Sequence, residues 1–586
     1  MSGDFSAPAF LARATGARRR LGRGLLRALA GAGLLLAQRA YADDVIVDPE
    51  LEKTSPSEQK TPPAEQKPAS GADHVIEDPE LAGSHSATTS PVPAPSVSTR
   101  GETTWRFSAH SRWGLDTTWT SPRQDIVEGT TVVSVEAEQR PSESLMYSLG
   151  LRVRHAVGIR RNGSARYELD LEPTSAFVDG TPGDGYHLRA GYQFVPLGRF
   201  DILSATNFLE AYDLRSGAVT MPEAAAIAQP ALRFDFDKIS GFTLQAYYLP
   251  FFQPHLVTGY GSDYAPPFDK FIDDSLRAQA AANPGSTPVD PRIALAGLNR
   301  STVARASTGL LQAFAPPADL THPQGALRAT FNGEAGELAF TGGTALERIP
   351  ALTFSDALTR AFLSGTALPS SLPPDAVRLD YNRFWMASVD GATDAGPVQL
   401  GVELAYMANR TFYAVGPTTA VPGPLPGSAP LQVVPPPIAE RVGVLHGGLR
   451  AELVEGAGWA AEVETLLEVV AGDAQTPAGG TGTWRWQGFQ SGRWFAALAG
   501  GAHWAPEGSR LKLEAGGMVF TGPSYVIFPR IEWEAVHTLF LELGAAFVGG
   551  VAPPGGTNFA ANAQMVSLGW LYTDVDQVFV GVRWTP

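Results

Sequence analysis

The chain has 586 residues, a formal net charge of −15 and a mean hydropathy of −0.05. This acidic balance, with no basic stripe, argues against nucleic-acid binding. The absence of cysteine excludes disulfides, thiol catalysis and cysteine-ligated metals. No uninterrupted run of about 18 apolar residues occurs, so helical membrane spans are not expected.

Residues 1–42 predict a secretory signal. A basic n-region contains the arginines from Arg13 to Arg23, and a short apolar segment follows from Leu25 to Ala37. Ala40-Tyr41-Ala42 then supplies the small residues of a cleavage site, so we expect cleavage after about Ala42. The alternative, a membrane anchor, is disfavoured because the apolar stretch is too short to span a bilayer.

Residues 43–103 predict a disordered periplasmic tether. The segment is rich in Pro, Ser, Thr, Glu and Lys and has almost no aromatic residues. Such a composition cannot bury enough apolar area to offset chain entropy. One motif occurs twice, because Val45-Ile-Val-Asp-Pro-Glu-Leu51 recurs as Val75-Ile-Glu-Asp-Pro-Glu-Leu81.

The repeated motif resembles a docking peptide for a periplasmic protein, used twice. Two copies on a flexible segment raise the effective concentration for a partner, and a Val-Ile start suits addition to the edge of a partner's sheet. The alternative is a duplicated spacer without a binding role. The docking candidates are Ile46, Asp48, Pro49, Leu51, Ile76, Asp78, Pro79 and Leu81.

Residues 104–586 alternate between apolar and polar side chains in segments of about ten residues, which is the usual length of a transmembrane strand. In Ala165–Glu172, Tyr167, Leu169 and Leu171 alternate with Arg166, Glu168, Asp170 and Glu172. The same alternation of apolar and polar residues recurs in residues 133–138, 147–154, 232–237, 445–453, 511–516 and 580–584. Side chains alternate across a strand, so each segment has one apolar and one polar face.

This length and alternation predict an all-β fold: a single large antiparallel β-barrel that crosses the outer membrane, apolar toward lipid and charged toward a lumen. We count between about 16 and 20 segments, and a preference for even numbers favours about 18 strands. Polar turns are predicted at residues 140–144, 179–185, 333–336 and 506–509. Four connections, 196–228, 252–322, 343–379 and 412–438, are long and expected outside the cell.

The first long connection, 196–228, is the candidate constriction. It carries apolar residues that suit packing on a barrel wall, together with the opposed charges Arg199, Asp201, Asp213 and Arg215. The alternative is that Arg199 with Asp201, and Asp213 with Arg215, form structural pairs that hold the loop. The pore-lining candidates on strands are Arg152, Arg154, Arg166, Glu168, Asp170, Arg233, Asp235, Asp237, Arg450 and Glu452.

Part of the chain resembles a family. The runs that carry the resemblance are Gly191-Tyr-Gln, Gly198-Arg-Phe-Asp, Leu209 to Arg215, Pro230 to Arg233 and Tyr248-Leu-Pro-Phe-Phe-Gln-Pro254. They are similar to porin-like bacterial outer-membrane barrels related to the alginate-export type. The resemblance implies an outer-membrane channel for small or polymeric hydrophilic solutes. Barrels of this kind usually end on an aromatic residue, whereas Thr585 and Pro586 follow Trp584 here.

Nothing in the sequence predicts an enzyme or a cofactor. No nucleophile elbow, phosphate-binding loop or dinucleotide fingerprint occurs. His446, on a charged strand face, is the single catalytic candidate, and it lacks an identifiable Ser or acid partner. Glu534 and His537 have a metal-like spacing, but on a strand they would lie on opposite faces, so no metal site is expected.

Three functions fit these observations. The first is a passive outer-membrane channel in which the infolded loop filters hydrophilic solutes. The second is a dedicated barrel for polysaccharide export that works with periplasmic proteins, and the repeated tether motif favours it. The third is a sealed barrel whose long loops bind outside the cell.

Overall fold

The computed structural model describes residues 103–117, 126–160, 165–200, 203–213, 226–256, 320–356, 377–416, 419–421, 431–433, 438–455, 458–476, 485–487, 493–506, 508–521, 524–550 and 576–586. The predicted signal, the tether up to residue 102 and both docking motifs lie outside these residues. Within the described ranges, no helix is long and apolar enough to cross a membrane.

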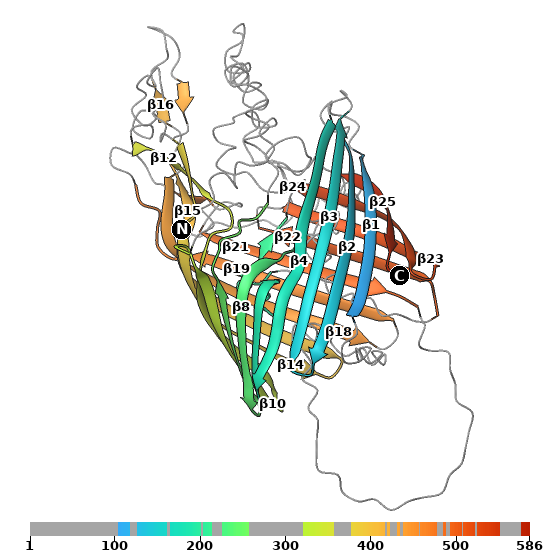
Figure 1. The fold of residues 1–586 in the computed structure, drawn as a ribbon. Helices are drawn as coiled ribbons and strands as arrows, with labels where there is room; N and C mark the ends of the chain where they lie inside the picture. The colour runs from blue at the N-terminus through green and yellow to red at the C-terminus, as the bar shows by residue number, and fades with distance from the viewer. Residues whose placement is uncertain are drawn as a thin grey trace, which may run out of the picture.

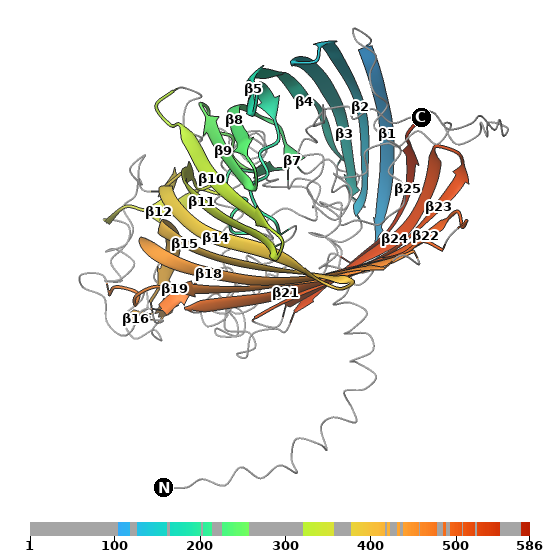
Figure 2. The same ribbon diagram turned by 90° about the horizontal axis from the view of Figure 1, so that it is seen from below.

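The described strands form one closed antiparallel barrel (Figures 1 and 2). The main sheet holds 19 strands, of which β20 (Arg485–Gln487) adds only to the upper part of β15, so 18 strands make the ring. In order around the ring they are β1 (Thr103–Asp116), β2 (Ile126–Ser142), β3 (Leu145–Arg160), β4 (Ala165–Gly183), β5 (Tyr186–Gln193), β8 (Gln229–Ile239), β9 (Phe242–Leu249), β10 (Gln324–Gly333), β11 (Gly336–Leu346), β14 (Arg383–Ala395), β15 (Val398–Val415), β18 (Ile438–Glu455), β19 (Trp459–Val470), β21 (Trp494–Trp504), β22 (Leu511–Phe520), β23 (Ser524–Val536), β24 (Leu539–Gly550) and β25 (Gln577–Trp584).

The ring closes where β1 pairs with β25, from Ala109 opposite Trp584 to Asp116 opposite Gln577. Thr585 continues this end by donating its backbone N–H to the carbonyl of Thr538, at 2.9 Å. The predicted all-β barrel of about 18 strands is therefore confirmed. Closure leaves no unpaired sheet edge, as a membrane-spanning sheet requires.

The two faces of the wall differ as the alternation predicts. On β4, Tyr167, Leu169 and Leu171 are exposed on the outer face, while Glu168 and Asp170 are more buried and point inward. The pairing register keeps the faces aligned from strand to strand, because Leu169 lies opposite His155 and Asp170 opposite Arg154. Segments 147–154 and 580–584 alternate in exposure in the same way.

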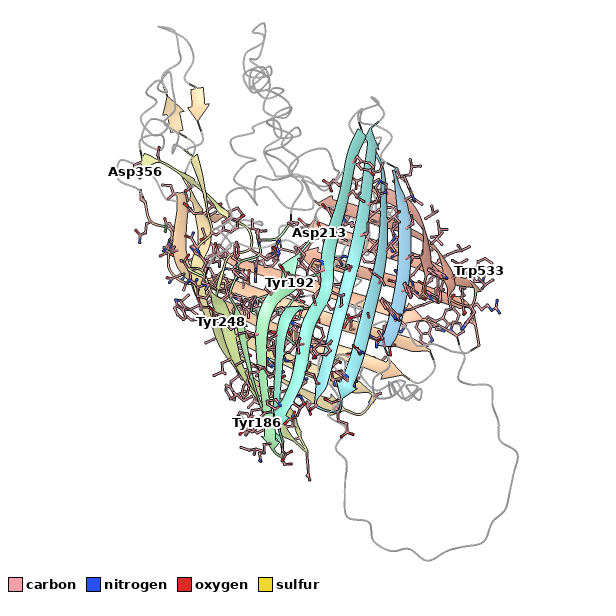
Figure 3. The ribbon with its side chains drawn as sticks, viewed as in Figure 1. Tyr186, Tyr192, Asp213, Tyr248, Asp356 and Trp533 are labelled. Atoms are coloured by element: carbon pink, nitrogen blue, oxygen red, sulfur yellow. The ribbon has the colours of Figure 1, made fainter. Side chains whose placement is uncertain are left out.

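Exposed aromatic side chains form two girdles on the outer face. Those on strand segments near the short turns are Trp105, Tyr147, Tyr186, Phe331, Trp459, Trp533 and Trp584. Those toward the opposite ends of the strands are Trp113, Tyr167, Tyr192, Tyr248, Trp385 and Trp494. Figure 3 shows Tyr186 at the short-turn end and Asp356 at the other. Leu, Val and Phe side chains fill the space between, which is typical of a barrel in a bilayer.

A β-bulge in β4 reverses the inward positions partway along the strand. The register with β3 shifts between Gly150 and Leu151, opposite Ser175 and Pro173. Even-numbered residues point inward before the bulge, and odd-numbered residues such as Ser175 and Asp179 point inward after it. A bulge inserts one extra residue into one strand and so exchanges its faces.

Connections are short at one end of the barrel and long at the other. The four predicted turns fall between β2 and β3, β4 and β5, β10 and β11, and β21 and β22. Small hairpins extend the long connections: β6 (Ala211–Tyr212) with β7 (Ala226–Ile227), β12 (Ala351–Phe354) with β13 (Val377–Asp380), and β16 (Thr419–Val421) with β17 (Leu431–Val433). Two further long connections, 471–493 and 551–576, were not predicted.

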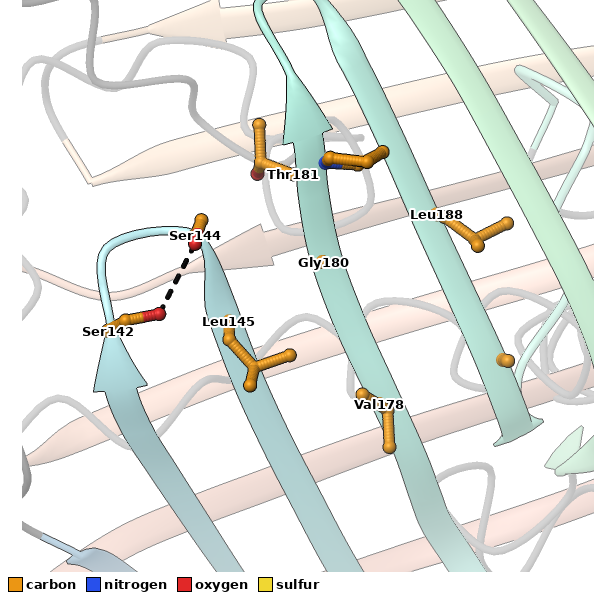
Figure 4. Close-up of a pocket in the computed structure, with 9 residues that line it drawn as sticks. Ser142, Ser144, Leu145, Val178, Gly180, Thr181 and Leu188 are labelled. Carbon is orange, nitrogen blue, oxygen red and sulfur yellow. Dashed lines mark hydrogen bonds between the residues drawn. The ribbon is translucent and has the colours of Figure 1, made fainter.

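A groove of about 380 Å³ lies on the outer face beside the β2–β3 and β4–β5 turns. Figure 4 shows its lining side chains, including Leu145, Val178 and Leu188. Val178 and Leu188 are exposed on the apolar outer face. This groove is therefore separate from the interior of the barrel.

Candidate functional site

The connection after β5 folds into the barrel instead of leaving it. In Figure 2, β7, which ends this connection, lies inside the ring of strands. Val195, Phe200 and Leu209 are fully buried although they belong to no strand of the barrel. We call the described part of this connection, residues 194–200 and 203–213, the infolded loop. Its burial agrees with the loop that the sequence predicts.

The outward limb of the infolded loop, which includes Val195, Leu197 and Leu203, packs against the wall of the barrel. Val195 and Leu197 belong to an apolar cluster with Tyr247 on β9 and Met407 on β15. Leu203, farther along, belongs to a second cluster with side chains of β19, β21 and β22. The loop therefore extends from β5 to strands on the other side of the ring.

Glycines on the inner wall receive the aromatic rings of the infolded loop. A Cβ atom placed on Gly448 would lie 2.6 Å from Cε2 of Phe200, and one on Gly401 would lie 3.2 Å from Cε1. A Cβ atom on Gly343 would similarly lie 2.7 Å from Cζ of Phe208. Real contacts are longer than these distances, so each ring occupies space that a larger residue would fill.

Glu403 on β15 anchors the far end of the infolded loop. Its carboxylate accepts bonds from the backbone N–H of Ala205 at 2.6 Å and of Thr206 at 3.1 Å. It also accepts from the hydroxyls of Ser204 at 2.9 Å and Thr206 at 3.1 Å. Two strands along, Glu464 of β19 accepts from the N–H of Leu203 at 2.9 Å. Charge-assisted bonds of this kind are the stronger class of hydrogen bond.

Arg199 joins the infolded loop to strands, whereas the alternative from sequence paired it with Asp201. Its guanidinium forms an ion pair with Glu337 of β11, and its Nε atom lies 3.6 Å from Asp390 of β14. Its carbonyl accepts a bond from Arg450 of β18 at 2.7 Å. Asp201 lies outside the described residues.

The return limb of the infolded loop reaches β3. Asp213 lies 3.7 Å from Nε of Arg154, and Figure 3 shows Asp213 between the two ends of the barrel. Gln229 of β8 donates to the carbonyl of Leu209 at 2.9 Å. Arg215, the predicted partner of Asp213, lies outside the described residues.

Arg348 and His255 hold three long connections together beyond the strands. Arg348 donates to the carbonyls of Leu209 and Gln253, and His255 Nδ1 accepts the backbone N–H of Tyr212 at 3.0 Å. Burial, and then the charge of Arg348, lower the pKa of His255 to about 3. A neutral imidazole is what an accepting Nδ1 atom requires.

The predicted pore-lining residues on strands lie on the inner face where the structure describes them. Arg152 bonds to Glu172 at 2.7 Å, and Arg233 lies 2.8 Å from Asp235. Arg450 lies 2.9 Å from Glu452. Asp237 lies beside the β8–β9 turn, and the side chain of Arg166 lies outside the described part of the chain.

His446 lies on the inner wall between two carboxylates. Its Nε2 atom is 3.7 Å from Glu403, and its Nδ1 atom is 3.7 Å from Glu468. Ser204, the nearby hydroxyl, donates to Glu403 and not to the imidazole. The order Ser–Glu–His differs from a catalytic triad, in which the imidazole lies between the nucleophile and the acid.

The expectation that Glu534 and His537 lie on opposite faces is wrong. Strand β23 ends at Val536, and the chain turns so that the Glu534 carboxylate lies 3.5 Å from Nδ1 of His537. The register shift between Glu534 and Val536 explains the change of direction. Over the described residues, no group of three or more His, Asp or Glu side chains is placed to hold a metal ion.

Sequence reasoning missed the residues that position the infolded loop. Glu403, Glu464 and Arg348 were not candidates, and neither were the glycines below Phe200. Glu403 alternates with Val402 and Leu404 in the sequence, but many other polar residues alternate with apolar ones in the same way. Its partner Ala205 is 198 residues away in the chain, and alternation carries no information about contacts across a lumen.

No family model matches the sequence, and no curated protein matches it. Solved structures similar to this chain include Salmonella typhi OmpF with daunomycin, at 9% identity and a TM-score of 0.34, covering 83% of this chain and 98% of that chain. Acinetobacter baumannii OccAB4 is 7% identical with a TM-score of 0.40, and the match covers 84% of this chain and 99% of that chain. Pseudomonas aeruginosa OpdK is 10% identical with a TM-score of 0.37, and the match covers 83% of this chain and 99% of that chain. Because these identities and TM-scores are low, no function is inferred from them.

Proposed function

We propose that this protein is a non-enzymatic outer-membrane channel for hydrophilic solutes. The observation that carries the proposal is a closed barrel with an apolar outer face and an ion-paired inner face, narrowed by a loop bound to its own wall. The outer face suits lipid, since two aromatic girdles border an apolar band. The inner face suits water and solutes, since it carries charged side chains that form ion pairs.

Passage requires no covalent chemistry. The infolded loop occupies part of the cross-section, and its bonds to Glu403 and Glu464 fix its position. A rigid loop sets a constant size limit, whereas a mobile one would not. Charges on the facing wall then act on each solute over short distances, where the low-dielectric wall strengthens their field.

Single-channel conductance in a planar bilayer tests this function. We expect the purified protein to show steady steps of constant size. A truncated chain that lacks residues 43–102 should give the same steps, since the barrel begins at Thr103 of β1. The absence of conductance in both proteins would contradict the proposal and indicate a sealed barrel.

A second function, polysaccharide export, is favoured by the repeated motif of the tether. A passive channel has no need for two copies of Val-Ile-x-Asp-Pro-Glu-Leu ahead of the barrel. This function would place the chain with the alginate-export type and require a periplasmic partner for Ile46, Asp48, Ile76 and Asp78. Deleting residues 43–102 distinguishes the two, because an exporter would lose secretion while its barrel still inserts.

A further inference from the structure

We infer that the constriction favours cations, because the infolded loop runs between two opposed ion-pair knots whose solvent-exposed members are carboxylates. This inference rests on the proposed channel function and names the class of solute that the channel prefers. The first knot consists of Arg154, Glu168, Asp170 and Asp213. The second consists of Arg450, Glu452, Glu462 and Glu464.

In the first knot, three carboxylates surround one guanidinium. Nη1 of Arg154 lies 3.4 Å from Glu168 and 3.5 Å from Asp170, both on β4. Its Nε atom lies 3.7 Å from Asp213 of the infolded loop. The return limb of the loop therefore ends at this knot.

The second knot has the same composition. Nη2 of Arg450 lies 2.9 Å from Glu452 and 3.0 Å from Glu462, and its Nε atom lies 3.7 Å from Glu464. The outward limb of the loop binds here, since Arg450 donates to the carbonyl of Arg199 at 2.7 Å. Glu464 accepts from the N–H of Leu203 as well.

The two knots face each other across the lumen. Counting from β1, β3 is the third strand of the ring and β18 is the twelfth, so they stand nine positions apart, which is half of 18. The same separation holds for β4 and β19. A solute that passes the infolded loop therefore travels between the two knots.

Within each knot, carboxylates are the groups most accessible to water. Side-chain exposure is 2% for Arg154 but 31% for Asp170, and it is 10% for Arg450 but 19% for Glu462. The same order holds for Arg233 with Asp235, and for Arg530 with Glu514. The guanidinium of Arg233 also lies over the ring of Tyr247, with Cζ 5.7 Å from the ring centroid.

Several cations depart from this order. Arg199 of the infolded loop is 27% exposed, but it pairs with Glu337 and Asp390. Arg410 is 33% exposed and pairs with Glu347, and Arg106 and Lys512 toward the short-turn end pair with Glu136 and Glu514. Each of these cations thus has a carboxylate beside it, whereas each knot gathers three carboxylates around one arginine, and rings of carboxylates favour cations in pores.

Reversal potentials in a KCl gradient test this inference. The wild-type channel should pass K⁺ in preference to Cl⁻. Asp170→Asn and Glu462→Gln should each lower the permeability ratio by about twofold or more, and the double variant should lower it further. Asp170→Glu, which keeps the charge, should preserve the ratio and shows that the site tolerates substitution.

Asp184→Asn is the matched control. It removes the same charge from a turn where the side chain is 92% exposed, outside the ring of strands. We expect an unchanged ratio. A wild-type channel that conducts without cation preference, or a control that shifts as far as Asp170→Asn, would overturn this inference and leave the channel itself intact. A protein that never conducts would instead refute the proposed function, and this inference with it.

Discussion

Glycines on the inner wall fix the positions of the largest side chains in the lumen. Gly448 and Gly401 lie beneath Phe200, and Gly544 lies beneath the ring of Phe579, whose atoms would come within 2.3 Å of an added Cβ. Glycine in a strand normally weakens it, so such residues mark places where another group approaches the backbone. Here that group is an aromatic ring lying flat on the wall.

Gly448→Ala should loosen the infolded loop. The added methyl would meet Phe200 at 2.6 Å and the carbonyl oxygen of Thr465 at 3.1 Å, so the ring must move. Overpacking of this kind costs about 1–3 kcal/mol. We expect noisier single-channel steps and faster protease cleavage of the loop. Gly447→Ala, on the same strand with nothing within 4 Å of its added Cβ, should behave as wild type; equal effects would contradict the role of Phe200.

The sequence predicts the face of a residue much better than its partner. Alternation places Arg154 and Arg450 on the polar side, because a strand repeats every two residues. It does not show that each arginine gathers three carboxylates, since Asp213 and Glu464 come from other elements. The alternative from sequence paired Arg199 with Asp201, two residues along the chain, whereas the fold supplies Glu337, a carboxylate from a distant strand.

The infolded loop behaves as an element of its own, held by hydrogen bonds to side chains of the wall. Its segment 203–206 does not pair with a barrel strand through the backbone, so its backbone N–H groups need other acceptors. Glu403 and Glu464 supply them. A loop with these bonds is a fixed partition of the lumen, which is what a constant size limit requires.

Glu403→Ala should release the far end of the infolded loop. Four bonds to its carboxylate are lost, and a single bond to a charged group contributes about 1.5–3 kcal/mol, so docking should weaken by at least about 3 kcal/mol. We expect larger and more variable conductance steps. Glu403→Gln keeps one acceptor oxygen and should be intermediate. Unchanged steps in Glu403→Ala would show that apolar packing alone holds the loop.

The contact between His255 and Tyr212 should weaken in acid. The folded pKa of about 3 lies below the ordinary 6.5, so the packed state binds fewer protons than the open one. Its stabilisation is complete above about pH 6.5 and declines as pH falls toward 3. Protease cleavage of the infolded loop should therefore accelerate over this range. His255→Gln keeps an acceptor for the Tyr212 N–H and should lose this dependence; a variant with an unchanged pH profile would assign the effect to another group.

At the scale of the whole molecule, the barrel wall has two different faces, an apolar one outside and a charged one inside. Its outer face carries exposed Leu, Val and aromatic side chains, and its inner face carries ion pairs. A chain with a mean hydropathy near zero achieves both because the two sets of residues alternate and average out. Closure into a barrel and a number of strands between about 16 and 20 follow from this pattern. The folding of the first long connection into the lumen follows from its apolar residues.

Leu449→Arg tests the membrane band at this scale. Leu449 is 61% exposed on the outer face of β18, beside the exposed Val402 of β15. An arginine in the middle of a lipid-facing band costs about 2–4 kcal/mol. We expect that loss in urea unfolding of the protein folded into phospholipid vesicles. Gln399→Arg adds the same charge on the inner face of β15, opposite Asp394 and Glu452, and should cost much less. Equal losses for the two variants would mean that the outer face does not contact lipid.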